Sequence, residues 1–282
     1  MRAIAEFAMR SRVRAVILTM VGIPLISPAV LALVGLRRGS GDGLFVLAWA
    51  LLPLVAAAAA GYMTPLMAGM AITHFVGVLA GALVLRATRS WSWALVALTA
   101  ASALGILVTS QVAGGVVESL SQAITEAAGG AQSPEAQQLS QAFASESQAT
   151  GYLCWVSVIS AALALILGRW WQATLYNPGG LREELHALRM PIPVAGAGML
   201  LWIYCLVNEH LVFWGAVAAF PMMVAGICLI HWLVARKGWG RGPLIAMYIT
   251  LVIAALPLAG FLCGLALIDS WIDIRARSGN NR

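Results

Sequence analysis

Charged side chains are scarce in this sequence. Asp, Glu, Lys and Arg make up only 10% of the 282 residues, whereas 61% are hydrophobic and the mean hydropathy is +0.88. A soluble domain carries about 25% charged residues, so an ordinary soluble fold is excluded. The strict alternation of apolar and polar residues that marks membrane β-strands is also absent. These absences favour a protein built from membrane-spanning helices.

The motifs of common catalytic and metal sites are missing as well. The four cysteines lie in apolar segments without CxxC spacing, so neither a disulfide framework nor a metal site is expected. Glu209 and His210 have no partner that would complete an HExxH-like motif. No Ser-His-Asp order, Cys-His pair or carboxylate pair stands out. The sequence therefore predicts no catalytic residues, no metal and no cofactor, and it gives an enzyme little support.

What the chain does have is a series of long apolar runs. They cover residues 43–60, 65–85, 92–112, 151–168, 193–207, 211–235 and 243–268. A helix of about 20 apolar residues crosses a hydrocarbon layer about 30 Å thick, and it satisfies its own backbone hydrogen bonds there. The sequence predicts an all-α, polytopic transmembrane helix bundle that forms a single domain over residues 1–282, with about seven full spans.

Residues 15–36 form a further apolar run, which contains Pro24 and Pro28. Proline removes a backbone donor and disfavours the helical conformation of the residue before it, so this run is either one kinked span or a hairpin. A hairpin gathers the basic residues on one side of the membrane and leaves only the three C-terminal arginines on the other. We therefore expect a hairpin in a bacterial inner membrane, with the N-terminus in the cytosol and the C-terminus outside.

The net charge of +6 comes from small basic clusters at the ends of the apolar runs. This placement is typical of membrane topology and argues against nucleic-acid binding. Residues 113–150 contain glutamates but neither lysine nor arginine, which favours an extracytoplasmic position. We expect two short helices there, joined at Gly129 and Gly130 and with Ser133 capping the second, although a solvated acidic loop is the simpler alternative.

Few polar groups fall inside the predicted spans. Gly69, Thr73, Gly77 and Gly81 recur every four residues, a pattern typical of close packing between membrane helices. His74 lies beside this stripe and is a candidate for proton relay or ligand binding, although a hydrogen bond to a neighbouring carbonyl is at least as common.

A second group of ligand or proton candidates is expected near the outer surface. Glu209 and His210 lie in the turn between two predicted spans, and Asp269 and Asp273 are four residues apart on the last one. The two aspartates could face Glu209 across the bundle and bind a cation or a proton. With Arg277 four residues beyond Asp273, an ordinary surface charge ladder is the alternative.

The cytosolic side carries the candidates for docking a protein or an anion. They lie in the glycine-rich turn at 36–44, in the span end at 85–95 and in a polar connector at 169–191. The residues are Arg37, Arg38, Arg86, Arg89, Trp170, Trp171, Tyr176, Asn177, Arg182, Glu183 and Glu184. Aromatic residues favour the headgroup layer, so we expect the connector to lie at the cytosolic interface.

Three stretches carry a family resemblance: LRRGSGDGL at 36–44, LRATRSWSWAL at 85–95 and RWWQATLYNPGGLREELHALR at 169–189. Together they resemble the YybS-like family of bacterial integral membrane proteins, for which no activity is established. The short proline-containing first segment is also loosely similar to the substrate-binding membrane subunits of energy-coupling-factor transporters. This chain has more predicted spans than those subunits, so the second likeness is topological only.

These observations leave three functional hypotheses. The first is a small-molecule carrier or substrate-binding membrane subunit with its site near His74. The second is an interaction or assembly factor that uses the basic cytosolic face, beside the lipid bilayer, to bind a cytosolic or membrane protein. The third is a lipid-linked enzyme at the interface, with Glu183, Glu184 or Asp42 as acid or base.

Overall fold

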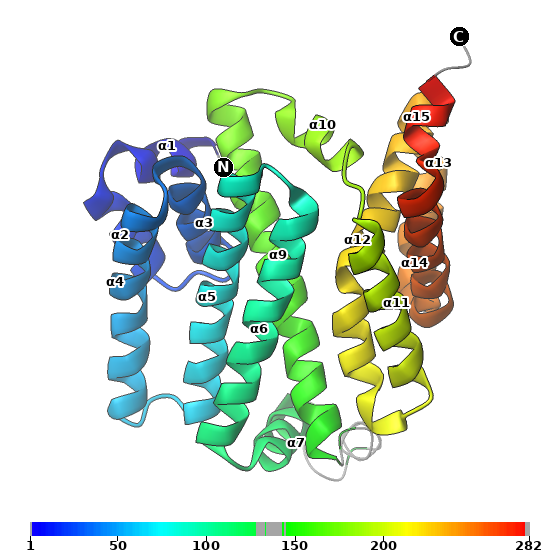
Figure 1. The fold of residues 1–282 in the computed structure, drawn as a ribbon. Helices are drawn as coiled ribbons and strands as arrows, with labels where there is room; N and C mark the ends of the chain where they lie inside the picture. Colours follow the sequence, from blue (N-terminus) through cyan, green and yellow to red (C-terminus); the bar gives the residue numbers. More distant parts are fainter. Residues whose placement is uncertain (1, 128–132, 134–142, 144, 280–282) are drawn as a thin grey trace.

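The structure is a computed structural model that describes residues 2–127, 133, 143 and 145–279, and its regular elements are all helical. The helices are α1 (Arg2–Arg10), α2 (Arg12–Met20), α3 (Ile26–Arg38), α4 (Ser40–Ala59), α5 (Pro65–Thr88), α6 (Trp91–Ala113), α7 (Val116–Ala127), α9 (Glu146–Tyr176), α10 (Gly180–His186), α11 (Ile192–Leu206), the 3₁₀ turn η1 (Glu209–Leu211), α12 (Val212–Lys237), α13 (Gly242–Ile253), α14 (Ala255–Ile272) and α15 (Ile274–Gly279). Most of them run roughly along one direction (Figure 1).

In the described part of the chain, six helices are long and apolar enough to cross a membrane: α4, α5, α6, α9, α12 with η1, and α14. The expected all-α bundle is therefore confirmed. The predicted span at 193–207 is α11, which has only 15 residues but packs along α12. Gly215 of α12 lets the two helices approach, because a Cβ there would lie 2.7 Å from the Cβ of Cys205.

The expectation of one span over residues 243–268 is wrong. The helix is interrupted at Ala254, where φ is −133° and ψ is 57°, and it divides into the short α13 and the longer α14. Pro257 explains the break, since it has no N–H to bond the carbonyl of Ile253 four residues earlier. The chain then returns toward the end from which α13 started, so the C-terminal helix lies at the same end as α1 and α10 (Figure 1). The expected placement of the C-terminus opposite the N-terminus is wrong for the same reason.

The N-terminal run at 15–36 folds back on itself as the hairpin α2–α3. Ser27 fixes the turn, because its Oγ donates to the carbonyl of Leu18 at 2.8 Å and accepts from the amide of Ile23 at 3.0 Å. Every residue of α3 from Ser27 to Leu36 is buried. A helix of 13 residues is too short to span a bilayer, and here the protein surrounds it.

Two clusters of buried side chains form the core, and α9 joins them. One cluster is built mainly from α5, α6, α9, α11, α12 and α14. The other gathers α1 to α5 around Trp171 of α9, whose side chain is fully buried. The stripe of small residues on α5 packs against α6: a Cβ on Gly77 would meet the Oγ of Ser102 at 2.6 Å. Close packing of these two helices depends on that missing side chain.

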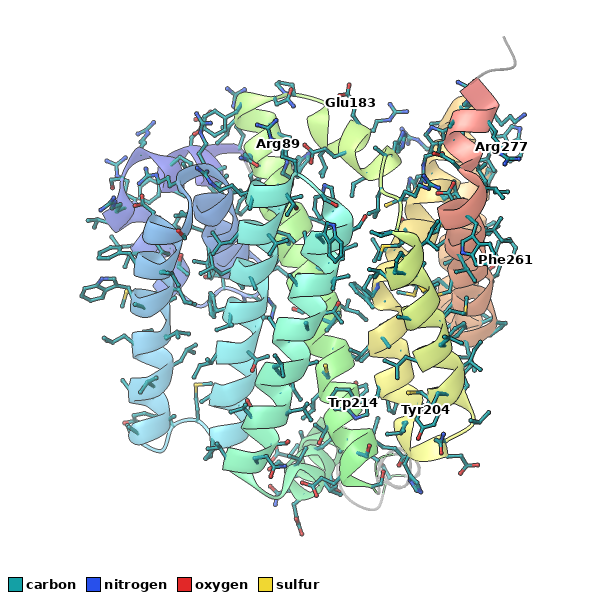
Figure 2. The ribbon with its side chains drawn as sticks, viewed as in Figure 1. Arg89, Glu183, Tyr204, Trp214, Phe261 and Arg277 are labelled. Atoms are coloured by element: carbon teal, nitrogen blue, oxygen red, sulfur yellow. The ribbon has the colours of Figure 1, made fainter. Side chains whose placement is uncertain are left out.

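The bundle has two chemically different ends. Every lysine and arginine in the described residues lies in or beside the segments at one of them, which we call the basic end. Figure 2 shows Arg89, Glu183 and Arg277 there, with Tyr204 and Trp214 toward the opposite end. At the opposite end lie α7 and η1, where Gln148 at the start of α9 donates to the carbonyl of Glu209 at 3.3 Å. The second short helix expected after Ser133 falls mostly outside the described residues.

Candidate functional site

The connector at 169–191 ties the two sides of the bundle together at the basic end. Glu184 of α10 forms an ion pair with Arg169 of α9 and also accepts a hydrogen bond from the indole Nε1 of Trp91 at 3.1 Å. The Arg169 side chain is only 10% exposed and that of Glu184 is 33% exposed. A nearly buried arginine needs this carboxylate, because an unpaired charge in that position is costly.

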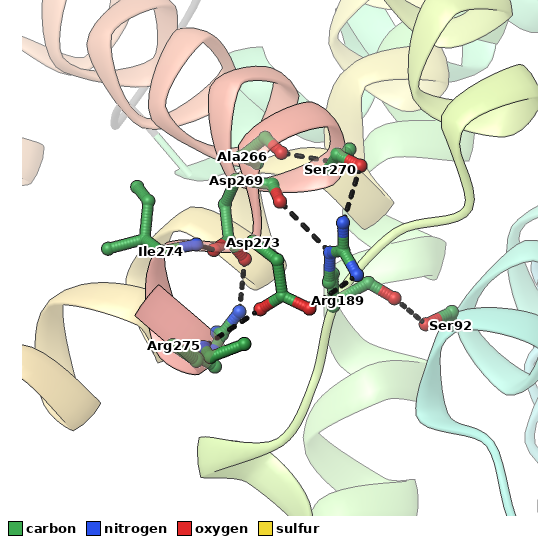
Figure 3. A network of polar contacts seen from close by, with 9 residues as sticks. Ser92, Arg189, Ala266, Asp269, Ser270, Asp273, Ile274 and Arg275 are labelled. Atoms are coloured by element: carbon green, nitrogen blue, oxygen red, sulfur yellow. Dashed lines mark hydrogen bonds and ion pairs between the residues drawn. The ribbon is translucent and has the colours of Figure 1, made fainter. Parts of the chain in front are cut away.

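The last residues of the connector hold the end of α14 (Figure 3). The guanidinium of Arg189 donates to the carbonyls of Asp269 and Ser270, at 2.9 and 2.7 Å, and pairs with the carboxylate of Asp273 at 2.9 Å. The carbonyl of Arg189 in turn accepts a hydrogen bond from Ser92 of α6 at 2.5 Å. Arg189 thus bonds two carbonyls in the last turn of α14, of which that of Asp269 also accepts from the amide of Asp273, and it connects α14 to α6.

A buried ion pair lies beside this network. Asp269 is 2% exposed and pairs with Arg275 of α15, and its second oxygen accepts from the amide of Ile274 at 3.1 Å. The guanidinium of Arg275 lies 6.0 Å from the ring of Trp232. Its Nε and Nη2 atoms are buried and form no hydrogen bond with the described residues. A buried donor without an acceptor costs free energy, so these two atoms of Arg275 destabilise the fold as it stands.

An apolar cavity of about 700 Å³ lies between α6, α11 and α12, and we call it the lateral groove. Its walls include Val96, Thr99 and Ala103 of α6, Ala197 and Tyr204 of α11, and Trp214 and Met222 of α12. Met190, the connector residue next to Arg189, lines it at the basic end. The groove therefore extends from the anchored connector toward the opposite end, where Trp214 and Tyr204 lie (Figure 2).

The predicted outer site does not form. Asp269 and Asp273 lie at the basic end, paired with Arg275 and Arg189, whereas Glu209 lies at the opposite end. The break at Ala254 causes this difference, because it reverses the direction of the last helix. His210 belongs to η1 with Glu209, so neither residue is near the aspartates. The expected ladder to Arg277 is also replaced, since Asp273 pairs with Arg189.

His74 lies within α5, with its Nε2 buried and without a hydrogen bond to the described residues. Its ring is 6.4 Å from that of Phe75. It lines neither of the two cavities described in this structure. The alternative of a hydrogen bond from this nitrogen to a neighbouring carbonyl is not realised.

Most of the predicted docking arginines at 36–44 and 85–95 have partners within the chain. Arg86 donates to the carbonyls of Leu36 and Arg37, at 2.8 and 2.7 Å. Arg37 lies over the ring of Tyr176 at 4.3 Å, and Arg38 donates to the carbonyl of Met9 at 2.7 Å and pairs with Asp42. Arg89, in contrast, is exposed; its amide donates to the carbonyl of Leu85 at 2.8 Å, and its side chain makes no hydrogen bond or ion pair with the described residues. Arg37, Arg38 and Arg86 therefore contact other parts of the same chain.

The connector's aromatic residues divide between surface and core. Trp170 is 42% exposed and Tyr176 is 46% exposed, as a position at the headgroup layer requires, but Trp171 is fully buried. The Asn177 side chain folds over Gly180, where a Cβ would lie 2.2 Å from the Asn177 Nδ2. The turn at 177–180 therefore depends on glycine.

In α10 itself, Arg182 and Glu183 are exposed, whereas Glu184 points inward. The sequence placed Arg169 and Arg189 within the connector at 169–191 without giving either a role, and it assigned neither Arg275 nor Trp91 to a site. One sequence feature could have singled out Arg189: it comes directly before Met190 and Pro191, where a short loop must turn into α11.

No known protein family, curated protein or solved structure matches the chain. Membership of the YybS-like family therefore stays a prediction. In the described residues, no cluster of His, Cys, Asp and Glu could hold a metal ion.

Proposed function

We propose that this chain is a membrane-embedded binding protein, a carrier or the substrate-binding subunit of a transporter, whose ligand has a long apolar part. The observation that carries the proposal is the lateral groove between α6, α11 and α12. Ligand sites in proteins have volumes of about 300–1,000 Å³ and are mostly apolar, with a few polar groups that orient the ligand. The groove, at about 700 Å³, has this size and character.

The chemistry of the groove walls defines the ligand class. They are apolar except for a few groups such as the hydroxyls of Thr99 and Tyr204, and the described residues that line the groove include no charged side chain. The hydroxyl of Thr99 is buried without a hydrogen-bond partner in the described residues, so it can bond a polar atom of the ligand. We therefore favour a lipid-like molecule that enters from the bilayer. A small polar metabolite would leave its own polar groups unsatisfied there.

The connector supplies a way to couple the groove to the basic end. Met190 lines the groove while Arg189, its neighbour, is bonded to α14 and, through its carbonyl, to Ser92. A ligand that moves Met190 would therefore strain these bonds. In a carrier, such a contact would report ligand occupancy to a partner at the surface of α10.

Filling the groove tests the proposal. Ala197→Phe places a large ring among the groove walls, and Ala56→Phe places the same ring on the exposed surface of α4 as a control. The purified chain should retain apolar molecules detectable by native mass spectrometry. We expect Ala197→Phe to lose them while the Ala56→Phe control keeps them. Equal retention by both variants, or an unliganded wild type that no lipid extract stabilises, would contradict the proposal.

We further propose that the basic end faces the cytosol in a bacterial inner membrane. The support is the concentration of the basic residues at that end, which is the arrangement favoured by the positive-inside rule. Reporter fusions to either terminus should then both be active on the cytosolic side. An active periplasmic reporter on either terminus would reverse this orientation.

The assembly-factor alternative has a narrower basis. Arg89, Arg182 and Glu183 are the expected docking residues that stay exposed in α10 and the α5–α6 turn. If these residues bind a protein, the triple alanine variant should lose a partner in crosslinking experiments and keep its groove ligand.

A further inference from the structure

A second cavity, of about 490 Å³, lies at the basic end between α10, the end of α12 and the start of α13. Arg182 and His186 of α10 line one side, and His231 and Val234 of α12 line the other. Trp239 and Leu244, in and after the turn between α12 and α13, complete the wall. The described residues that line this cavity include no acid.

Positive charge converges on this space from three elements. The pKa of His186 is lowered from its ordinary value of 6.5 by burial first and then by the charges of Arg182, His231 and Arg275. Arg182 and His231 line the same cavity as His186, and Arg275 lies behind it without lining it. Arg275 is neutralised in part by Asp269, but its Nε and Nη2 atoms remain without a partner in the described residues. The ion pairs among the described residues do not include Arg182.

The backbone adds to the same potential. The cavity contacts the turn at Gly238, which has a φ of 66°, and the first turn of α13 at Leu244. In this first turn Pro243 has no N–H and the amide of Ile245 bonds the carbonyl of Arg241, so the amides of Gly242 and Leu244 are the ones that carry partial positive charge toward a ligand. An anion in the cavity would therefore meet side-chain and backbone donors together, the combination that phosphate groups prefer.

We propose that this cavity binds a phosphate group, with Arg182 and His186 as its principal ligands and His231 as a neighbouring donor. His231 is held by the hydroxyl of Tyr248 at 2.9 Å, which orients its ring. The phosphate can belong to a phosphomonoester lipid headgroup, as in phosphatidic acid, or to a free phosphate compound, and both present terminal phosphate oxygens with up to two negative charges. This site is separate from the lateral groove and does not depend on it.

The test uses the purified full-length chain in neutral detergent and measures its thermal unfolding midpoint. Inorganic phosphate is titrated in one series. Phosphatidic acid is titrated in a second series, with diacylglycerol of the same chains as the uncharged control. Stabilisation by phosphate alone would identify a free compound, and stabilisation by phosphatidic acid alone would identify a headgroup. Either result supports the site, and no stabilisation by either one overturns it.

Two variants assign the effect to the cavity. Arg182→Gln and His186→Gln should each weaken binding about tenfold, the loss expected for one charge-assisted contact. Arg89→Gln removes an exposed charge at the same end and does not line the cavity, so it should bind as the wild type does. Equal weakening by Arg89→Gln and Arg182→Gln would mean that only the surface charge matters, which would overturn the proposal. Because Arg182 is exposed, its variant should keep the fold.

Discussion

Two helices of this bundle, α3 and α14, return to the basic end and are held in the same way. A glycine brings each one close to a neighbour: a Cβ on Gly168 of α9 would lie 2.7 Å from the carbonyl of Ala29, and one on Gly226 of α12 would lie 2.3 Å from that of Leu262. An arginine then binds the carbonyls at each C-terminus, Arg86 for α3 and Arg189 for α14.

The surroundings of the two helices differ. The segment of α3 from Ser27 to Leu36 is entirely buried, whereas only 28% of the residues of α14 are buried inside the protein. The arginines around α3 find carbonyls or carboxylates, while Arg275 near α14 keeps two donors without partners in the described residues. The cavity beside α10 lies among the C-terminal helices, and the lateral groove lies where α6 faces α11 and α12. The N-terminal hairpin is therefore packed tightly into the bundle, whereas α14 is mostly exposed and the two proposed ligand sites lie along α10, α11 and α12.

The largest expected effect comes from removing the carboxylate that holds the connector. Glu184→Ala leaves Arg169 nearly buried and unpaired, so we expect a loss of about 3 kcal/mol of unfolding free energy. Glu183→Ala removes an exposed neighbour and should change stability by less than about 0.5 kcal/mol. Chemical unfolding in detergent measures both. Similar values for the two variants would show that the connector does not secure the C-terminal half.

The glycine contact of α14 should matter next. Gly226→Ala forces α12 and α14 apart, with an expected cost of about 2 kcal/mol, the middle of the range for overpacked cores. Gly264→Ala on α14 has no heavy atom within 4 Å of the new Cβ and should be neutral or slightly stabilising. Thermal unfolding of the two variants tests this contrast. An unaffected Gly226→Ala variant would mean that the two helices separate without cost.

Arg189 and Arg86, which bind the carbonyls at the ends of α14 and α3, should contribute different amounts to the free energy of unfolding. Arg189→Ala removes two carbonyl contacts and the ion pair with Asp273, at an expected cost of about 2 kcal/mol. Arg86→Ala removes two carbonyl contacts on an exposed side chain and should cost about 1 kcal/mol. Limited proteolysis should release α14 and α15 early in the first variant only. Early release of the N-terminal hairpin from both would remove the distinction between the halves.

The smallest effect concerns pH. Because the folded protein lowers the pKa of His186 below 6.5, the unfolded chain takes up this proton first as the pH falls. The free energy of unfolding should therefore have its full value above pH 6.5 and decrease as the pH falls below that value. Phosphate should reduce the decline, since it stabilises the protonated ring. His186→Gln should flatten the profile, and an unchanged profile in that variant would assign the effect to another group.

The sequence was sufficient for the helical architecture and insufficient for the site. Apolar length located the spans, and the two prolines with the charge distribution indicated the hairpin at 15–36. Pro257 could have revealed the break at Ala254, but a run of apolar residues concealed it. Trp171 was expected at the surface because aromatic residues favour the interface, yet packing placed it in the core. The groove depends on how α6, α11 and α12 fit together, which no local pattern encodes.

The lateral groove is the central claim, and photo-crosslinking in membranes tests it most directly. A lipid analogue with a diazirine on its alkyl chain would be activated in vesicles that contain the protein, and the modified peptides would be mapped by mass spectrometry. We predict labelling concentrated on the groove faces of α6, α11 and α12, at residues such as Ala103, Ala197 and Met222, and lost in the Ala197→Phe variant. Labelling spread evenly over exposed helices such as α4 and α13 would contradict a binding site there.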